Sequence, residues 1–253
     1  MKHLFLIAAG LLLFNQVYAQ QKEGTVFYQK VSSPAFTLNG QTQKMPEIVN
    51  KYELIFSGSK SIFKNLPRTA EDQKIQSNGS TLGMVSNNTL QLQYYDFDQK
   101  IQVRTKVLGT NDYIIEGALP DFGWVISDEI KNILGYACKK ATGKSINKVL
   151  TTSVQNRVVS VNQKIDTVSV TAWFTSDITS PTGPDKYAGL PGLILQVENA
   201  KGTVLFEAVS IKPEIKEKEL RQPAKGKKMS TEEFEKEEKK FREESTKAMN
   251  GIN

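Results

Sequence analysis

Histidine and cysteine are almost absent from this chain. Its 253 residues include one histidine, His3, and one cysteine, Cys138. His3 lies within the first 19 residues, which have the pattern of a cleaved signal peptide, so the mature chain offers no histidine for a catalytic base or a metal site. A single cysteine cannot form a disulfide within the chain, and the fold must therefore be stabilised by its core.

Long hydrophobic runs are missing as well. The apolar run Leu4–Phe14 has 11 residues, whereas a membrane-spanning helix needs about 20. This run follows Lys2 and precedes Val17–Ala19, which has the small residues of a cleavage site. We therefore predict a signal peptide over residues 1–19 and a mature chain that begins at Gln20 and has no transmembrane segment.

The charge balance excludes one class of partner. The chain has 33 Lys and Arg residues against 27 Asp and Glu, a formal net charge of +6. A mild surplus of this kind favours solubility, and the basic residues are not concentrated in one stripe. For an exported chain, nucleic acid is thus not an expected partner.

Paired carboxylates are the remaining candidates for catalysis. Acidic pairs occur at Asp96/Asp98, Asp128/Glu129 and Asp177/Asp185. Two carboxylates roughly 5–9 Å apart are the working groups of a glycosidase. However, all of these residues lie in predicted turns, where aspartate commonly binds the backbone. We predict no catalytic residue, no metal and no cofactor, and a carboxylate-dependent hydrolase is the third of three functional hypotheses.

Strand patterns dominate the middle of the chain. Tyr52–Phe56, Ile101–Val107 and Leu193–Val197 alternate apolar with polar positions, which is typical of half-buried strands. Short turns separate most of these segments, which favours antiparallel hairpins. We predict a mainly β domain over 20–211, built as a strongly curved antiparallel sheet or incomplete β-barrel. Within it, 66–85 is expected to be a surface loop, and 162–164 the turn of a long hairpin.

The C-terminal region has a different composition. Residues 212–229 are charged and nearly without apolar side chains, which predicts a linker. Ser230 and Glu233 have the spacing of a capping box, and Phe234 and Phe241 lie on one stripe of a charged amphipathic α-helix over 230–250. The thin stripe predicts a lightly docked tail that the fold does not need. A helix that binds a partner is the alternative.

The stretch from Tyr187 to Asn199 joins a rigid kink to a core strand. Pro191 fixes its own φ, and Gly192 follows it, which is the requirement for a type II turn with positive φ at Gly192. The structural motif consists of Gly189, Leu190, Pro191, Gly192, Leu193 and Ile194.

This hexapeptide resembles the signature of the GLPGLI family. Three other blocks support the resemblance: 52–63 near the start, 124–141 in the middle, and Trp173–Ile178 just before the hexapeptide. The resemblance implies an exported protein of a Gram-negative envelope, located in the periplasm or associated with the outer membrane. It supplies no catalytic residue, because the function of the family is largely uncharacterised.

Aromatic residues are the clue to binding. Trp124, Trp173, Phe174 and Tyr187 lie in or beside these blocks and are expected to border a concave apolar site, although packing in the core is the commoner use of such residues. Cys138 is expected to be buried and inert, with a reactive thiol or soft copper ligand as the alternative. The leading hypothesis is a non-catalytic binding protein for an apolar small molecule or an envelope protein. The second is an accessory or assembly factor that acts by protein contact near an outer-membrane transporter.

Overall fold

The computed structural model describes residues 21–32, 35–38, 41–44, 48–67, 91–155, 158–200 and 204–251. Its main element is one sheet of 12 strands. In spatial order the sheet consists of β14 (Lys227–Ser230), β8 (Asn111–Ala118), β7 (Ile101–Leu108), β6 (Leu92–Asp96), β5 (Lys60–Asn65), β4 (Ile48–Ser57), β1 (Glu23–Ser32), β13 (Val204–Lys212), β12 (Leu193–Asn199), β11 (Val158–Thr175), β10 (Tyr136–Gln155) and β9 (Val125–Ile133). A separate hairpin pairs β2 (Ala35–Leu38) with β3 (Gln41–Lys44), and the C-terminal region carries the 3-10 helix η1 (Glu217–Glu219) and the α-helix α2 (Thr231–Met249).

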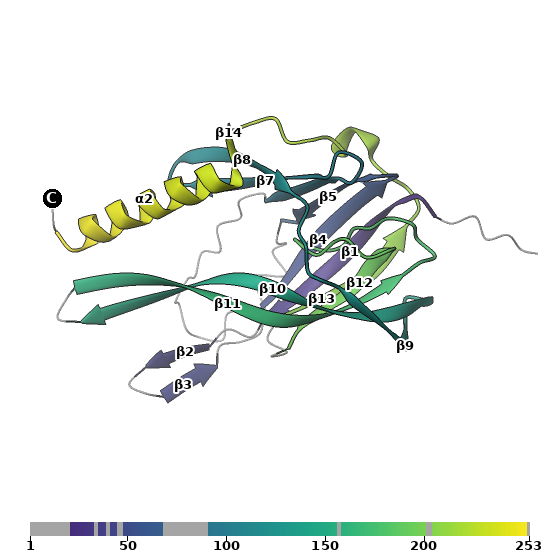
Figure 1. The fold of residues 1–253 in the computed structure, drawn as a ribbon, viewed down its shortest axis with the longest axis horizontal. Helices are drawn as coiled ribbons and strands as arrows, with labels where there is room; N and C mark the ends of the chain where they lie inside the picture. The colour runs from purple at the N-terminus through teal and green to yellow at the C-terminus, as the bar shows by residue number, and fades with distance from the viewer. Residues whose placement is uncertain are drawn as a thin grey trace, which may run out of the picture.

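The sheet is strongly curved and open, with β9 and β14 at its two edges (Figure 1). This confirms the predicted mainly β fold with an incomplete barrel. Pairing between neighbours is antiparallel, except that β14 runs parallel to β8. The first strand, β1, lies between β4 and β13, so the early and late parts of the domain meet at the centre of the sheet.

Alternation along the strands divides the sheet into two apolar faces. On the inner, concave face, Val26 and Tyr28 of β1 pack with Leu54 and Phe56 of β4, and all four are at most 1% exposed. Segment 176–192, which joins β11 to β12, packs against this same core through buried apolar side chains such as Ile178 and Leu190. The concave face beneath segment 176–192 is therefore filled by the chain itself.

The outer face has a second apolar cluster. Its buried members come from five adjacent strands: Ile55, Ile62, Tyr94, Val103 and Ile114. Ile215 and Leu220 pack against them from residues 213–226, which we call the C-terminal strap. The sequence predicts a linker over 212–229, but this segment is packed on the sheet and ends in the strand β14.

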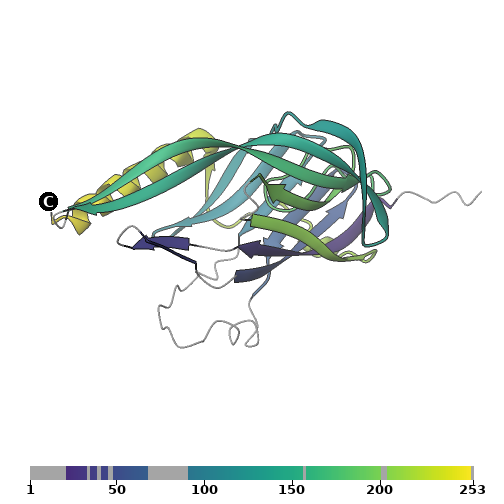
Figure 2. The same cartoon turned by 90° about the horizontal axis from the view of Figure 1, so that it is seen from below.

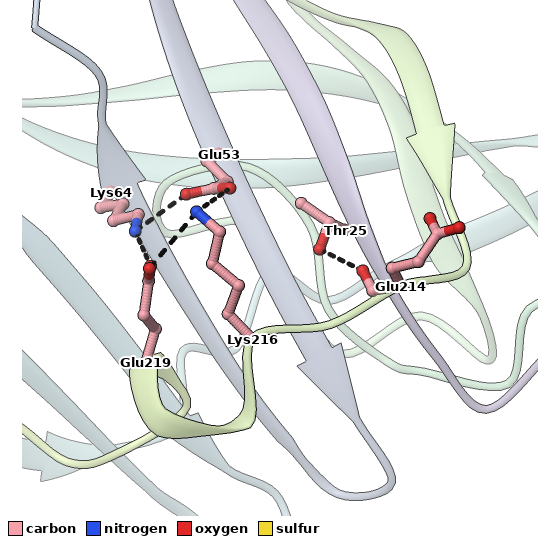
Figure 3. A network of polar contacts seen from close by, with 6 residues as sticks. All are labelled: Thr25, Glu53, Lys64, Glu214, Lys216 and Glu219. Carbon is pink, nitrogen blue, oxygen red and sulfur yellow. Dashed lines mark hydrogen bonds and ion pairs between the residues drawn. The ribbon is translucent and has the colours of Figure 1, made fainter.

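Charged side chains fasten the strap to the sheet (Figure 3). The side chain of Glu53 is only 6% exposed, and its carboxylate lies 2.8 Å from Lys64 Nζ and 3.9 Å from Lys216 Nζ. Glu219 of the strap forms a hydrogen-bonded ion pair with Lys64. Beside this network, Thr25 Oγ1 donates a 2.7 Å hydrogen bond to the carbonyl oxygen of Glu214. A buried carboxylate and its two cations thus hold the strap in register.

The helix α2 and the hairpin β10–β11 project to the same side of the sheet and lie side by side (Figures 1 and 2). The predicted capping box is present, because Ser230 and Glu233 exchange side-chain-to-backbone hydrogen bonds. Phe234 is 2% exposed and packs on Tyr113 with ring centroids 5.3 Å apart, so the helix is docked more firmly than a thin stripe predicts. Within the described residues, no helix has the length and apolar character needed to cross a membrane.

One predicted turn is absent from the structure, and two predicted segments lie wholly or mostly outside the described residues. The predicted turn at 162–164 is wrong: Asn162 pairs with Thr151 inside the β10–β11 ladder, and both strands continue well beyond it. The signal peptide over 1–19 lies outside the described residues. So does most of the predicted loop over 66–85, of which only Leu66 and Pro67 are described.

Candidate functional site

The hexapeptide forms a kink that folds back on segment 176–192. Gly192 has φ +153°, and its N–H donates a 2.8 Å hydrogen bond to the carbonyl oxygen of Leu190 across Pro191. The predicted positive φ at Gly192 is therefore confirmed. The predicted type II turn is wrong, because its φ at this position would be about +80° and because the N–H of Leu193 donates to the carbonyl oxygen of Ile178 and not to that of Leu190. A bond across one residue is a γ-turn, which suits a proline at its centre.

A continuous row of aromatic rings crosses the inner face. We call Tyr52, Phe63, Phe206, Tyr187, Phe122 and Trp124 the aromatic band. Neighbouring centroids are separated by 5.0 Å for Tyr52–Phe63, 5.6 Å for Tyr52–Phe206, 6.3 Å for Phe206–Tyr187, 5.3 Å for Tyr187–Phe122 and 5.0 Å for Phe122–Trp124. Such separations are typical of favourable ring contacts. Three members, Tyr52, Tyr187 and Trp124, are only partly buried, so the band has rings at the surface.

The structure brings together two of the four predicted ligand-binding residues. Trp124 and Tyr187 both contact Phe122 in the aromatic band. Phe174 is 1% exposed and belongs to the core, so it cannot line an accessible surface. Trp173 pairs with Gln196 in the sheet, and its ring lies 5.5 Å from Lys131 Nζ. In the described part of the chain, no ring contact joins Trp173 to the aromatic band.

Segment 176–192 holds Tyr187 in place through backbone contacts. The indole N–H of Trp124 donates a 2.9 Å hydrogen bond to the carbonyl oxygen of Ala188. The N–H of Tyr187 donates to Pro184 at 3.1 Å, and Asp185 between them has φ +56°. A left-handed conformation is uncommon outside glycine, and the surrounding contacts must maintain it. It places Lys186 and Tyr187 beside the inner face of the sheet.

Three basic side chains border the aromatic band. Lys30 Nζ lies 4.8 Å from the centroid of Phe206. Lys186 Nζ lies 5.9 Å from the centroid of Tyr187 and donates a 2.8 Å hydrogen bond to Asn147 Oδ1 of β10. The pKa of Lys186 is lowered, chiefly by burial; nearby Lys30 and Arg104 lower it further, whereas Asp185 opposes the shift.

Sequence reasoning missed these basic residues, although part of the signal was present. Val26, Tyr28 and Lys30 are spaced by two along β1, which places Lys30 on the inner face after two core residues. Arg104 follows Gln102 by two residues, and Gln102 pairs with the buried Tyr95. No local sequence pattern, however, predicts that β1, β7 and segment 176–192 lie close together.

The other candidate chemistry lies elsewhere. Cys138 is fully buried, and burial together with the charge of Asp177 raises the pKa of its thiol to about 11, as expected for an inert side chain. Asp96 accepts a hydrogen bond from the N–H of Gln99, and Asp98 accepts one from Ser59 Oγ. These two carboxylates thus bind turn groups.

An open cavity of about 580 Å³ lies between the distal part of β11 and the helix α2. Its lining residues are Val161, Asn162, Gln163, Lys239, Arg242, Glu243, Thr246 and Lys247. Four of the eight lining residues are charged, and five are exposed at the surface. The cavity is separate in sequence and composition from the aromatic band.

Comparison with known proteins gives a partial family match and a fold match. Residues 124–196 match a family described as "Protein of unknown function (Porph_ging)", a segment that holds Trp124, Tyr187 and the hexapeptide. No curated protein matches the chain. Two solved structures of PNGF-II, in space groups C2 and P21, each have a TM-score of 0.51 and are 16% and 15% identical. The matches cover 87% of this chain but only 33% and 34% of PNGF-II, so the chain spans about a third of that protein and shares its fold over that part.

Proposed function

We propose that the protein is a non-catalytic binding protein of the periplasm whose ligand lies against the aromatic band. The observation that carries this proposal is a row of six aromatic rings on the concave side of the sheet, three of which are partly exposed. Concave surfaces with aromatic rings and a few polar groups are the usual form of small-molecule sites. We also propose membership of the GLPGLI family, because the matched segment 124–196 includes that hexapeptide.

Burial decides where on the concave face a ligand fits. Beneath segment 176–192, Ile178, Leu190 and Phe174 are at most 1% exposed, which leaves no surface for a ligand. Tyr187 and Tyr52, in contrast, are partly exposed. The proposed ligand therefore has an apolar body that covers these rings without entering the core.

A second candidate function is contact with another protein. The edge strand β9 exposes Val125 at 66% and Ile130 at 67%. An edge strand with exposed apolar side chains is a surface on which another chain can add a strand. This observation supports our second hypothesis, an accessory or assembly factor that acts by protein contact.

Tryptophan fluorescence tests the binding function directly. The chain has two tryptophans, so Trp173→Phe leaves Trp124 as the only reporter at the aromatic band. Protein exported to the periplasm of a Gram-negative host is purified, and native mass spectrometry identifies any apolar molecule that accompanies it. Delipidated Trp173→Phe protein should then change its emission when that molecule is returned, and Tyr187→Ala should weaken the response.

The matched control is Trp124→Phe, whose only reporter is Trp173 beside Lys131. Its emission should stay constant over the same titration. If no molecule accompanies the protein and no added amphiphile changes the emission of Trp124, the binding function is refuted. Loss of an envelope protein from the purified sample upon Ile130→Asp would then support the protein-contact function.

A further inference from the structure

We propose that the ligand carries an anionic group, a phosphate or a carboxylate, and that Lys30, Arg104 and Lys186 bind this group at the border of the aromatic band. This inference rests on the proposed binding function and adds the chemical class of the ligand. The three side chains come from β1, β7 and segment 176–192, and all face the inner side of the sheet.

The strand register places the first two cations. Lys30 pairs with Phe206 across β1 and β13, and its ammonium group lies over the Phe206 ring. Arg104 pairs with Gln93 across β6 and β7, on the same face as the buried Tyr95. Lys30 lies near the end of β1, and Arg104 lies in the middle of β7.

Lys186 joins them from segment 176–192. Its ammonium group donates to Asn147 of β10 and lies over the ring of Tyr187, which in turn contacts Phe206. A chain of contacts therefore runs from Lys30 through the rings of Phe206 and Tyr187 to Lys186, with one cation at each end. Arg104 is near enough for its charge to lower the pKa of Lys186.

These positive charges repel one another, and the described residues offer little to offset the repulsion. None of the three forms an ion pair with a described residue; Asp185 alone acts on Lys186 with the opposite charge. Elsewhere the protein pairs its partly buried cations: Lys64, for example, contacts both Glu53 and Glu219. Grouped like charges in a partly desolvated site are costly unless an anion binds them.

The arrangement also fits an anion attached to an apolar body. Lysine and arginine donate charge-assisted hydrogen bonds to phosphate or carboxylate oxygens, and the Asn147 amide adds a polar group beside Lys186. The partly exposed ring of Tyr187 lies beside Lys186 and would contact the apolar part. An anionic amphiphile and a small acidic molecule share this chemistry.

Three probes separate these sources. Dihexanoyl phosphatidic acid, dihexanoyl phosphatidylcholine and inorganic phosphate are each titrated, as monomers, into Trp173→Phe protein, with Trp124 emission and thermal stability as readouts. We expect phosphatidic acid to bind at least tenfold more tightly than phosphatidylcholine, which has the same chains but no net charge. Lys186→Met and Arg104→Met should each weaken the binding of phosphatidic acid roughly tenfold, which is the loss expected for one charge-assisted hydrogen bond.

The control is Lys139→Met, which removes an exposed lysine of β10 and should change neither affinity. Equal binding of both lipids, unchanged by Lys186→Met and Arg104→Met, would overturn the anion inference and leave the binding function standing. If phosphate binds but neither lipid does, and if Lys186→Met and Arg104→Met each abolish phosphate binding, the anion site is supported and the ligand has no apolar body. If none of the three probes binds, the inference is overturned, and the co-purification experiment decides separately whether another ligand occupies the band.

Discussion

Replacing Gly192 by alanine tests the physical role of the hexapeptide. An added Cβ at this position would lie 2.0 Å from the carbonyl oxygen of Thr175 and 2.7 Å from its carbonyl carbon. Both atoms belong to the backbone of β11, so no side chain can move aside to relieve the clash. In addition, φ at Gly192 is +153°, which residues with a Cβ rarely adopt.

The two effects set the expected magnitude. Overpacking against rigid structure costs typically about 1–3 kcal/mol, and a residue held in a disfavoured backbone region costs about 1–3 kcal/mol. Together they predict a loss of roughly 4 kcal/mol in the free energy of unfolding. For a protein of this size, about 2–4 °C of melting temperature is lost per kcal/mol. Gly192→Ala should therefore melt roughly 8–16 °C below the wild type.

Gly189→Ala is the matched control, because it alters the same motif without the clash. Gly189 has φ +91°, and a Cβ there would meet nothing within 4 Å. Its cost should be that of backbone strain alone, about half the loss in Gly192→Ala. Thermal unfolding followed by circular dichroism measures both. Equal losses in the two variants, or a loss below about 2 °C in Gly192→Ala, would refute the argument from close approach.

Three further predictions concern the strap and the buried thiol. Glu219→Gln should lower the free energy of unfolding by about 0.5–1 kcal/mol at pH 7, whereas the control Glu217→Gln should leave it unchanged. The hydrogen bond from Lys64 lowers the pKa of Glu219 in the folded protein. The stability contributed by the Glu219 carboxylate is therefore present above the pKa of the unfolded state and is lost as the pH falls through the folded pKa. Urea titrations at pH 7 and pH 3 measure it, and an equal effect at both pH values contradicts the ion pair. Cys138 should react with a thiol reagent slowly in the native protein and rapidly in denaturant, and fast native labelling would contradict its burial. Truncation after Pro213 removes the apolar side chains that cover the outer face, and burial of each contributes up to about 1.5–3 kcal/mol to stability. We expect the melting temperature to fall by more than about 10 °C. A change of only a few degrees would instead support the sequence-based prediction of a dispensable tail.

Local alternation predicts the sheet but not the packing of the strap. In β4 the three consecutive residues Leu54, Ile55 and Phe56 are all buried, which is the local sign that both faces of a strand are covered. Alternation over Tyr52–Phe56 predicts a half-buried strand, whereas in the structure both faces of β4 are covered. Ile215 and Leu220 pack over the outer face of the sheet. In the sequence, however, a charged segment with only two such apolar residues is typical of a linker.

The candidate site shows the same division between local and distant information. Trp173 and Phe174 are adjacent on a strand, where successive side chains point to opposite faces, so alternation alone predicts that they do not share one surface. Trp124 and Tyr187 meet through Phe122, a contact between segments more than 60 residues apart in the chain. Lys30, Arg104 and Lys186 are equally distant, and only the curvature of the sheet brings them together.

The close approach at Gly192 links the hexapeptide to the aromatic band. Segment 176–192 begins after Thr175 and ends at Gly192, whose backbone lies against Thr175, so the two ends of the segment are fastened at one point. The N–H of Gly189 donates to Pro181 and that of Ile194 donates to Thr182, which holds the segment on the inner face between its ends. A loop closed in this way keeps its shape because its ends and its middle are fixed independently. We therefore infer that the hexapeptide acts by setting the position of the loop that carries Lys186 and Tyr187 to the band.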